Sequence, residues 1–185
     1  MCFFGAINFT RMTSPTATLL VAVAGECVCV KIAGRANFAV SVDFKRLLVE
    51  LRARGHRRFI LDLSGCLIMD STFLGVLARQ AMDQAKNAPE PCTLELLNPN
   101  AKVADLLDNL GVLSLFRVVQ SSDPAHLNFE NVACAGMETN KLEMSRNCLE
   151  AHQTLMALNP ENAARFKDVA KFLTEDLKKL ETPPN

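Results

Sequence analysis

The alternation of apolar and polar positions predicts a sheet with helices packed against it. Residues 17–24 and 26–33 are two short apolar segments separated by Gly25, as expected for strands joined by a tight turn. In the segment that follows, apolar residues recur at helical spacing, and this helix is expected to stop at Gly55. The apolar segment 59–63 lies between two predicted helices, so it is expected to be a strand paired in parallel.

The same alternation continues as far as residue 120. A helix is predicted to begin at Asp70 or Ser71, where the apolar residues change to helical spacing. Three further elements follow, namely a strand at residues 93–97, a helix at about 100–110 and a strand at 116–119. The order β-β-α-β-α-β-α-β favours an α/β fold, with a mixed sheet of four to five strands and helices packed on it.

Two more helices are predicted near the C-terminus, at residues 138–158 and 160–181, with Pro160 at the first position of the second helix. This second helix is amphipathic, and its apolar face carries Phe166, Val169, Phe172, Leu173, Leu177 and Leu180. Such a face is unfavourable in water, so we expect it to dock within the chain or in a homodimer.

The domain organisation follows from these patterns. Residues 1–16 are expected to be a disordered leader, and Met12 is consistent with a natural start. The main domain is predicted at 17–120, a linker at 121–137 and a C-terminal helical pair at 138–182.

Charge and composition exclude several classes of function. Lys plus Arg and Asp plus Glu both number 20, and the chain has no Trp or Tyr, so neither a basic patch nor a base-stacking surface points to nucleic acid. No apolar run approaches the roughly 20 residues of a membrane span, and the N-terminus lacks the pattern of a secretory signal. We therefore expect a cytoplasmic protein without a membrane span.

The seven cysteines form no Cys-x-x-Cys pair, and the three histidines have no ligand-like spacing to them. We expect reduced, buried thiols and neither a metal nor a cofactor. An alternative of another class, an enzyme with a reactive cysteine, would require a thiol of low pKa in an exposed, electropositive setting.

The predicted helix start at Asp70 and Ser71 has a chemistry of its own. Backbone N–H groups in a first helical turn lack intrahelical acceptors, so these donors and the helix dipole would favour a phosphate on Ser71. The phosphate would add about −1.5 to −2 charges beside Asp70 and would repel a partner docked there. The alternative is that both residues only cap the helix, a common role for Asp and Ser. Thr72 is a weaker candidate acceptor.

Three blocks of sequence, in order, carry a family resemblance. They are residues 32–37, the segment Leu61-Asp62-Leu63-Ser64 with Met69-Asp70-Ser71-Thr72-Phe73-Leu74-Gly75, and the segment from Asn98-Pro99 to Phe116. Over about residues 17–120 the chain resembles STAS domains, the sulfate-transporter and anti-sigma-factor-antagonist family. The resemblance implies the STAS (SpoIIAA-like) fold, to which the C-terminal helical pair is an addition.

The resemblance also implies a partner-binding face made of Asn37, Asp70, Ser71, Thr72 and Phe73, with Ser71 as the phosphorylation site. Two of these positions depart from the family pattern. Phe73 stands where many antagonists have Gly, and Asn37 stands where many have Asp. Both departures affect the identity of the partner more than the fold. Gly75, which is not part of this face, is expected to let its helix approach the sheet.

The function that the resemblance implies is that of a bacterial anti-sigma factor antagonist, a regulatory protein without enzymatic activity. Its unphosphorylated form would bind an anti-sigma factor that is itself a serine kinase, and so free a sigma factor for transcription. A metal-dependent serine phosphatase would reset Ser71. An alternative within the same class is an unphosphorylated STAS subunit of a transporter or signalling complex, such as the accessory protein of a lipid-trafficking transporter.

Overall fold

The computed structural model describes residues 17–25, 27–87, 94–120, 129–131 and 140–181. The predicted leader at 1–16 and most of the predicted linker at 121–137 lie outside these residues. Within the linker only 129–131 are described.

The sheet has the order β6-β5-β3-β2-β1-β7, with β4 paired to the end of β2. Its strands are β1 (Thr18–Ala24), β2 (Cys27–Ala36), β3 (Arg58–Asp62), β4 (Cys66–Met69), β5 (Leu94–Leu97), β6 (Phe116–Val119) and β7 (Glu130–Asn131). Strands β1 and β2 are antiparallel around Gly25, whose positive φ of 61° suits a tight turn. The pairs β2–β3, β3–β5 and β5–β6 are parallel. The predicted α/β fold with a mixed sheet is confirmed.

Two short strands of this sheet were not predicted. Strand β4 falls in the segment between the strand at 59–63 and the helix start, and its Leu67 and Ile68 side chains are exposed. Strand β7 has only two residues, falls in the predicted linker and pairs with β1. Neither segment has the length or the strict alternation by which a strand is recognised from sequence.

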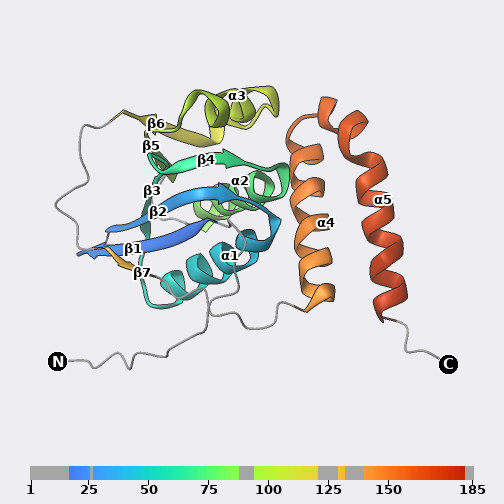
Figure 1. Ribbon diagram of the computed structural model, residues 1–185, viewed down its shortest axis with the longest axis horizontal. Helices are drawn as coiled ribbons and strands as arrows, with labels where there is room; N and C mark the ends of the chain where they lie inside the picture. The colour runs from blue at the N-terminus through green and yellow to red at the C-terminus, as the bar shows by residue number, and fades with distance from the viewer. Residues whose placement is uncertain (1–16, 26, 88–93, 121–128, 132–139, 182–185) are drawn as a thin grey trace.

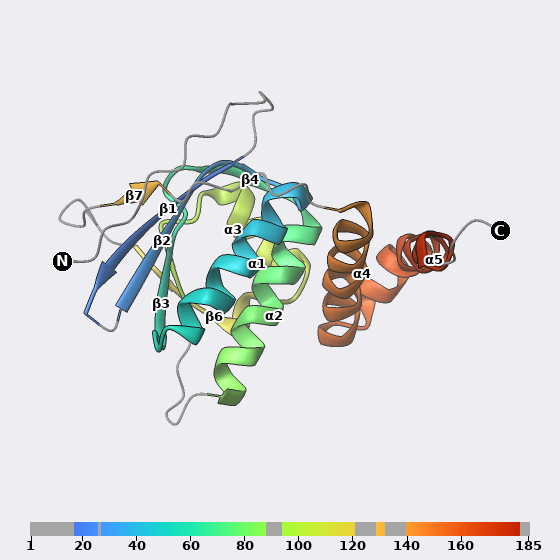
Figure 2. The same ribbon diagram turned by 90° about the horizontal axis from the view of Figure 1, so that it is seen from below.

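The helices are α1 (Phe38–Ala53), α2 (Ser71–Asn87), α3 (Ala101–Asn109), α4 (Lys141–Leu158) and α5 (Glu161–Glu181), with a 3-10 turn, η1, at Leu113–Leu115. Helices α1 and α2 run side by side against the sheet, α4 packs on both of them, and α5 packs on the outer side of α4 (Figures 1 and 2). Both predicted C-terminal helices are therefore present.

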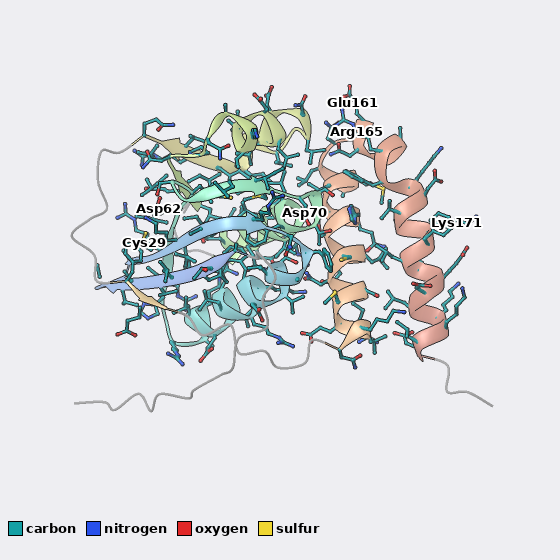
Figure 3. All side chains as sticks on the ribbon, viewed as in Figure 1. Cys29, Asp62, Asp70, Glu161, Arg165 and Lys171 are labelled. Carbon is teal, nitrogen blue, oxygen red and sulfur yellow. The ribbon has the colours of Figure 1, made fainter. Side chains whose placement is uncertain are left out.

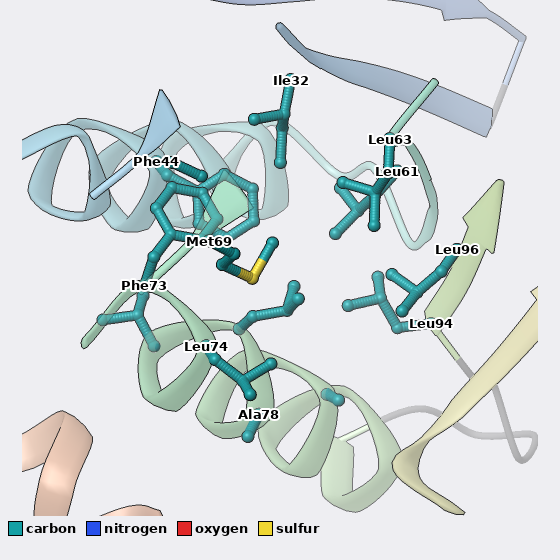
Figure 4. Packing of buried hydrophobic residues seen from close by; sticks show 14 of the residues in the cluster. Ile32, Phe44, Leu61, Leu63, Met69, Phe73, Leu74, Ala78, Leu94 and Leu96 are labelled. Carbon is teal, nitrogen blue, oxygen red and sulfur yellow. The ribbon is translucent and has the colours of Figure 1, made fainter. Parts of the chain in front are cut away.

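The main core lies between the sheet and helices α1 and α2 (Figure 4). Phe44 of α1 and Phe73 of α2 are fully buried, and their ring centroids are 5.0 Å apart. Leu74 and Leu77 are also fully buried and hold α2 on the sheet. The first turn of α2 is thus held in place by its own apolar side chains.

The apolar face of α5 is divided in two. Leu177 is buried and Phe166 packs against the core, whereas Val169, Phe172 and Leu180 are exposed, Phe172 to 67% of its surface. Docking within the chain therefore covers only part of the face that the sequence marks as apolar. Among the described helices, none combines the length and apolar character needed to cross a membrane.

Candidate functional site

The candidate site lies where the N-termini of α1 and α2 meet, and Asp70 joins the two helices. Its Oδ1 accepts the backbone N–H of Phe73, at 2.8 Å, in the first turn of α2. Its Oδ2 accepts the backbone N–H of Phe38, also at 2.8 Å, at the start of α1. Figure 3 shows Asp70 at the end of the sheet domain that faces α4. A single carboxylate therefore serves the positive ends of two helices.

Ser71 is the first residue of α2 and is half-buried. Its Oγ lies 3.2 Å from Nε2 of His152, a residue of α4. The other ring nitrogen of His152, Nδ1, lies 2.8 Å from the carbonyl oxygen of Cys148, which can only accept a hydrogen bond. The neutral imidazole therefore carries its proton on Nδ1, and its Nε2 accepts a hydrogen bond from the Ser71 hydroxyl.

His152 is buried, and this burial lowers the pKa of its imidazole below the ordinary value of 6.5. The hydrogen bond to the Cys148 carbonyl and the negative charge of Asp70 oppose the shift without cancelling it. The ring also packs on Phe166 of α5, with centroids 4.9 Å apart. Near neutral pH the imidazole beside Ser71 is therefore uncharged.

Helices α2 and α4 cross in very close contact at Gly75. A Cβ at this position would lie 2.7 Å from the carbonyl carbon of Ala151 and 2.8 Å from its Cα, closer than real Cβ atoms approach backbone. Glycine is required here because α4, rather than the sheet, approaches α2. The expectation that Gly75 serves contact with the sheet is wrong.

Polar contacts also join α4 to α1. Asn147 donates from Nδ2 to the Ser41 Oγ at 2.8 Å, and both side chains are buried. The ammonium of Lys45 lies 2.7 Å from Glu150, and Arg46 pairs with Glu143, its Nε 3.1 Å from the carboxylate. Helix α4 thus lies over the start of α2 and the middle of α1.

In the structure, the other predicted partner-binding residues do not share a single exposed face. Phe73 is fully buried in the core and reaches no surface, so its assignment as a partner contact is corrected. Thr72 is also buried, where its hydroxyl bonds to the Cys148 thiol of α4. Asn37 caps α1, its Oδ1 accepting from the Val40 N–H at 3.3 Å. Only Asp70, Ser71 and Asn37 remain partly accessible.

His152 is the residue of this site that sequence reasoning missed. It contacts Ser71 across 81 positions of the chain. No local signal marks it, because a single histidine on a predicted helix has the same pattern whether it faces a serine or solvent.

Three of the described cysteines have thiols that burial makes harder to ionise. Burial raises the pKa of Cys29 to about 11 and also raises the pKa of Cys66 and of Cys148. A nucleophilic cysteine requires the opposite shift. Among the described residues, no three His, Cys, Asp or Glu side chains are grouped in a way that could hold a metal ion.

Comparison with known proteins agrees with this architecture. The family model described as "Mlab, STAS domain" matches residues 19–117, which is more than half of the chain. The chain therefore belongs to the STAS domain family. No curated protein matches it in sequence.

Solved structures similar to this chain are distant in sequence. The NMR structure of TM1081 is 17% identical, with a TM-score of 0.50, covering 65% of this chain and 91% of TM1081. The crystal structure of TM1081 from Thermotoga maritima is 19% identical, with a TM-score of 0.48, covering 55% and 85%. The anti-sigma factor antagonist SpoIIAA, in its unphosphorylated form, is 18% identical, with a TM-score of 0.47, covering 56% and 88%. At this identity the likeness concerns the fold alone.

Acidification is expected to destabilise the chain through His152. Because its folded pKa is depressed, His152 contributes stability that is fully present above about pH 6.5 and is lost as the pH falls below that value. The groups that face the ring are the Asp70 carboxylate, the Ser71 hydroxyl, the Cys148 carbonyl and the Phe166 ring.

Thermal unfolding followed by circular dichroism at about pH 7.5 and about pH 5.5 measures this contribution. The wild-type chain should lose more in Tm over this range than His152→Gln, which keeps a polar side chain but cannot titrate. Equal losses for the two chains would show that the pH dependence arises elsewhere.

Proposed function

We propose that this chain is a regulatory protein-binding switch of the anti-sigma factor antagonist type, acting in the cytoplasm and controlled by phosphorylation of Ser71. The observation that supports it most is the position of Ser71 at the first residue of α2, next to the capping carboxylate of Asp70. The family membership supports a regulatory domain without enzymatic activity.

The proposed modification is an ordinary phosphoryl transfer. A serine kinase transfers the γ-phosphoryl group of ATP to Ser71 Oγ, so that a new P–O bond forms, the bond to ADP breaks and the hydroxyl proton is released. N–H groups of the first turn of α2 have no intrahelical acceptors and favour the phosphate oxygens. A metal-dependent phosphatase returns the serine by hydrolysis.

Phosphorylation would act on binding mainly through charge. A phosphate adds about −1.5 to −2 charges at a position where Asp70 already contributes one. The start of α2, of which Ser71 is the first residue, favours this charge. A partner that docks on the same face meets both the repulsion and the added volume, so the unphosphorylated form is the binding form.

A charge series at Ser71 tests this function. The full-length chain is purified from its own cells as wild type, Ser71→Ala and Ser71→Glu, and the kinase that co-purifies is measured by quantitative mass spectrometry. We expect phosphate on Ser71 in the wild type only. Ser71→Ala should recover as much kinase as the wild type, and Ser71→Glu should recover at least about tenfold less. Ser64→Glu, which adds charge at an exposed loop residue, is the control.

If Ser71→Glu retains the kinase as tightly as the wild type and Ser64→Glu do, the charge switch is refuted. Loss of the kinase from all variants, Ser71→Ala included, would contradict it equally.

A second candidate is a STAS subunit that docks constitutively in a transporter or signalling complex. One observation favours it, namely that the Ser71 hydroxyl is half-buried and bonded to His152, so it is not presented to a kinase in this arrangement. The family model that matches is also the one described as Mlab. This candidate predicts that Ser71 carries no phosphate in the purified chain and that Ser71→Ala leaves every partner unchanged.

A further inference from the structure

The face of α1 and α2 around Ser71 already holds a helix, the chain's own α4. Residues on successive turns of α4 face it. Among them are Glu143, Asn147, Glu150, Ala151, His152 and Leu155, the last of which reaches the core. These contacts are those of one helix lying across the groove between two others, with its closest approach at Gly75 of α2.

The groove sets three requirements on any helix that fills it. At Gly75 the approach is so close that only a small residue can stand opposite, as Ala151 does. On α1, Lys45 and Arg46 receive carboxylates from Glu150 and Glu143, which are seven residues apart. Near Ser71 a hydrogen-bond acceptor is required, and His152 supplies it.

The fit of α4 in this groove is incomplete. Asn147, which faces α1, has a buried Oδ1 with no hydrogen-bond partner among the described residues. Water would satisfy this atom if the hairpin left its place. Both ion pairs to α1 are also partly exposed to solvent, which limits their contribution to stability. The far end of the hairpin is held by Asn162 and Arg165, which donate to the carbonyls of Leu110 and Asn109.

With Ser71 in the rotamer that faces His152, a phosphate on its hydroxyl and a docked α4 are incompatible. The Ser71 Oγ lies 3.2 Å from the His152 ring nitrogen, which leaves no room for a phosphorus and three oxygens between them. The phosphate would also stand beside Thr72 and Cys148, which are in contact with each other. Phosphorylation therefore requires α4 to leave first, and it keeps α4 from returning.

We propose that α4 is a built-in competitor for the Ser71 face, and that the partner of this face is an acidic amphipathic helix that displaces it. The displacing helix carries a small residue opposite Gly75 and two carboxylates one heptad apart, opposite Lys45 and Arg46. This inference rests on the proposed function in one respect only, that the Ser71 face is the partner-binding face.

The test uses the full chain and a synthetic peptide of residues 140–158, which is α4 itself. In the chain, Glu143→Arg with Glu150→Lys turns both ion pairs into repulsions and leaves the groove unaltered. We expect the labelled peptide to bind this variant at least about tenfold more tightly than the wild-type chain, measured by fluorescence anisotropy. Adding Gly75→Ala to this variant chain should abolish peptide binding. A peptide with Ala151→Leu should not bind the variant chain.

Native-state hydrogen exchange provides a measurement without substitutions. Amides of α4 in the wild-type chain should exchange through a local opening while β3 and β5 remain protected. In Ser71→Glu the exchange of α4 should accelerate by about tenfold or more, and in Ser64→Glu it should not.

Three results would overturn the proposal. One is equal peptide binding by the wild-type chain and by the chain with Glu143→Arg and Glu150→Lys. Another is unchanged α4 exchange in Ser71→Glu. The third is loss of protection in β3 and β5 together with α4, because α4 would then belong to the same cooperative unit as the sheet. None of these measurements involves a kinase. An absence of Ser71 phosphorylation in cells would therefore refute the proposed function without affecting the inference that α4 competes for the Ser71 face.

Discussion

Phe73→Ala is expected to lower the free energy of unfolding by about 3–5 kcal/mol, the range for deleting a fully buried phenylalanine. Phe73 has no exposed surface and packs its ring on Phe44, so its removal opens a cavity between α1 and α2. Chemical denaturation at constant pH measures the loss. The effect on partner binding should follow only from this loss of stability, because no part of the side chain reaches the surface.

Phe172→Ala is the matched control for this experiment. Phe172 is 67% exposed on α5, so its truncation should change the free energy of unfolding by about 0.5 kcal/mol or less. A loss below about 1 kcal/mol for Phe73→Ala would mean that Phe73 is not part of the core in solution.

Asp70→Asn is expected to lower the free energy of unfolding by about 1–2 kcal/mol. The sequence alone suggests a neutral change, since Asn caps helices as well as Asp does. In the structure both carboxylate oxygens accept backbone N–H groups, one from each helix. An amide offers one oxygen, so one N–H faces the new NH2 group, and a negative charge near two helix dipoles is lost.

Asp105→Asn is the control for charge, because Asp105 is exposed on α3. It should leave the free energy of unfolding within about 0.5 kcal/mol of wild type. If Asp70→Asn were as stable as Asp105→Asn, the bridge between the two helix starts would contribute nothing measurable.

The parts of the fold that the sequence could predict are those set by local pattern. The parallel strand at 59–63, the helix start at Asp70 or Ser71 and the two C-terminal helices each have a period or a cap that neighbouring residues specify. The position of Ser71 at the first residue of α2 was predicted for the same reason, and the structure has it there.

The parts that were missed depend on contacts between distant segments. Gly75 shows no sign in the sequence of which element approaches it, and Ala151, the residue opposite, is an ordinary helix former. Phe73 falls in a motif that implies a surface, yet the helical period directs it at Phe44. His152 joins the site only because α4 crosses α2, and no local period encodes that crossing.

The separation of Ser71 and His152 along the chain also orders events during synthesis. The two residues are 81 positions apart, so at about 5–20 residues per second Ser71 emerges from the ribosome roughly 4–16 s before His152. Parallel pairing of the sheet needs only residues up to β6, so the main domain has its strands before α4 has been made. Each newly made molecule therefore begins with its Ser71 face uncovered, and under the proposed function a partner present at the ribosome would meet that face before α4 does.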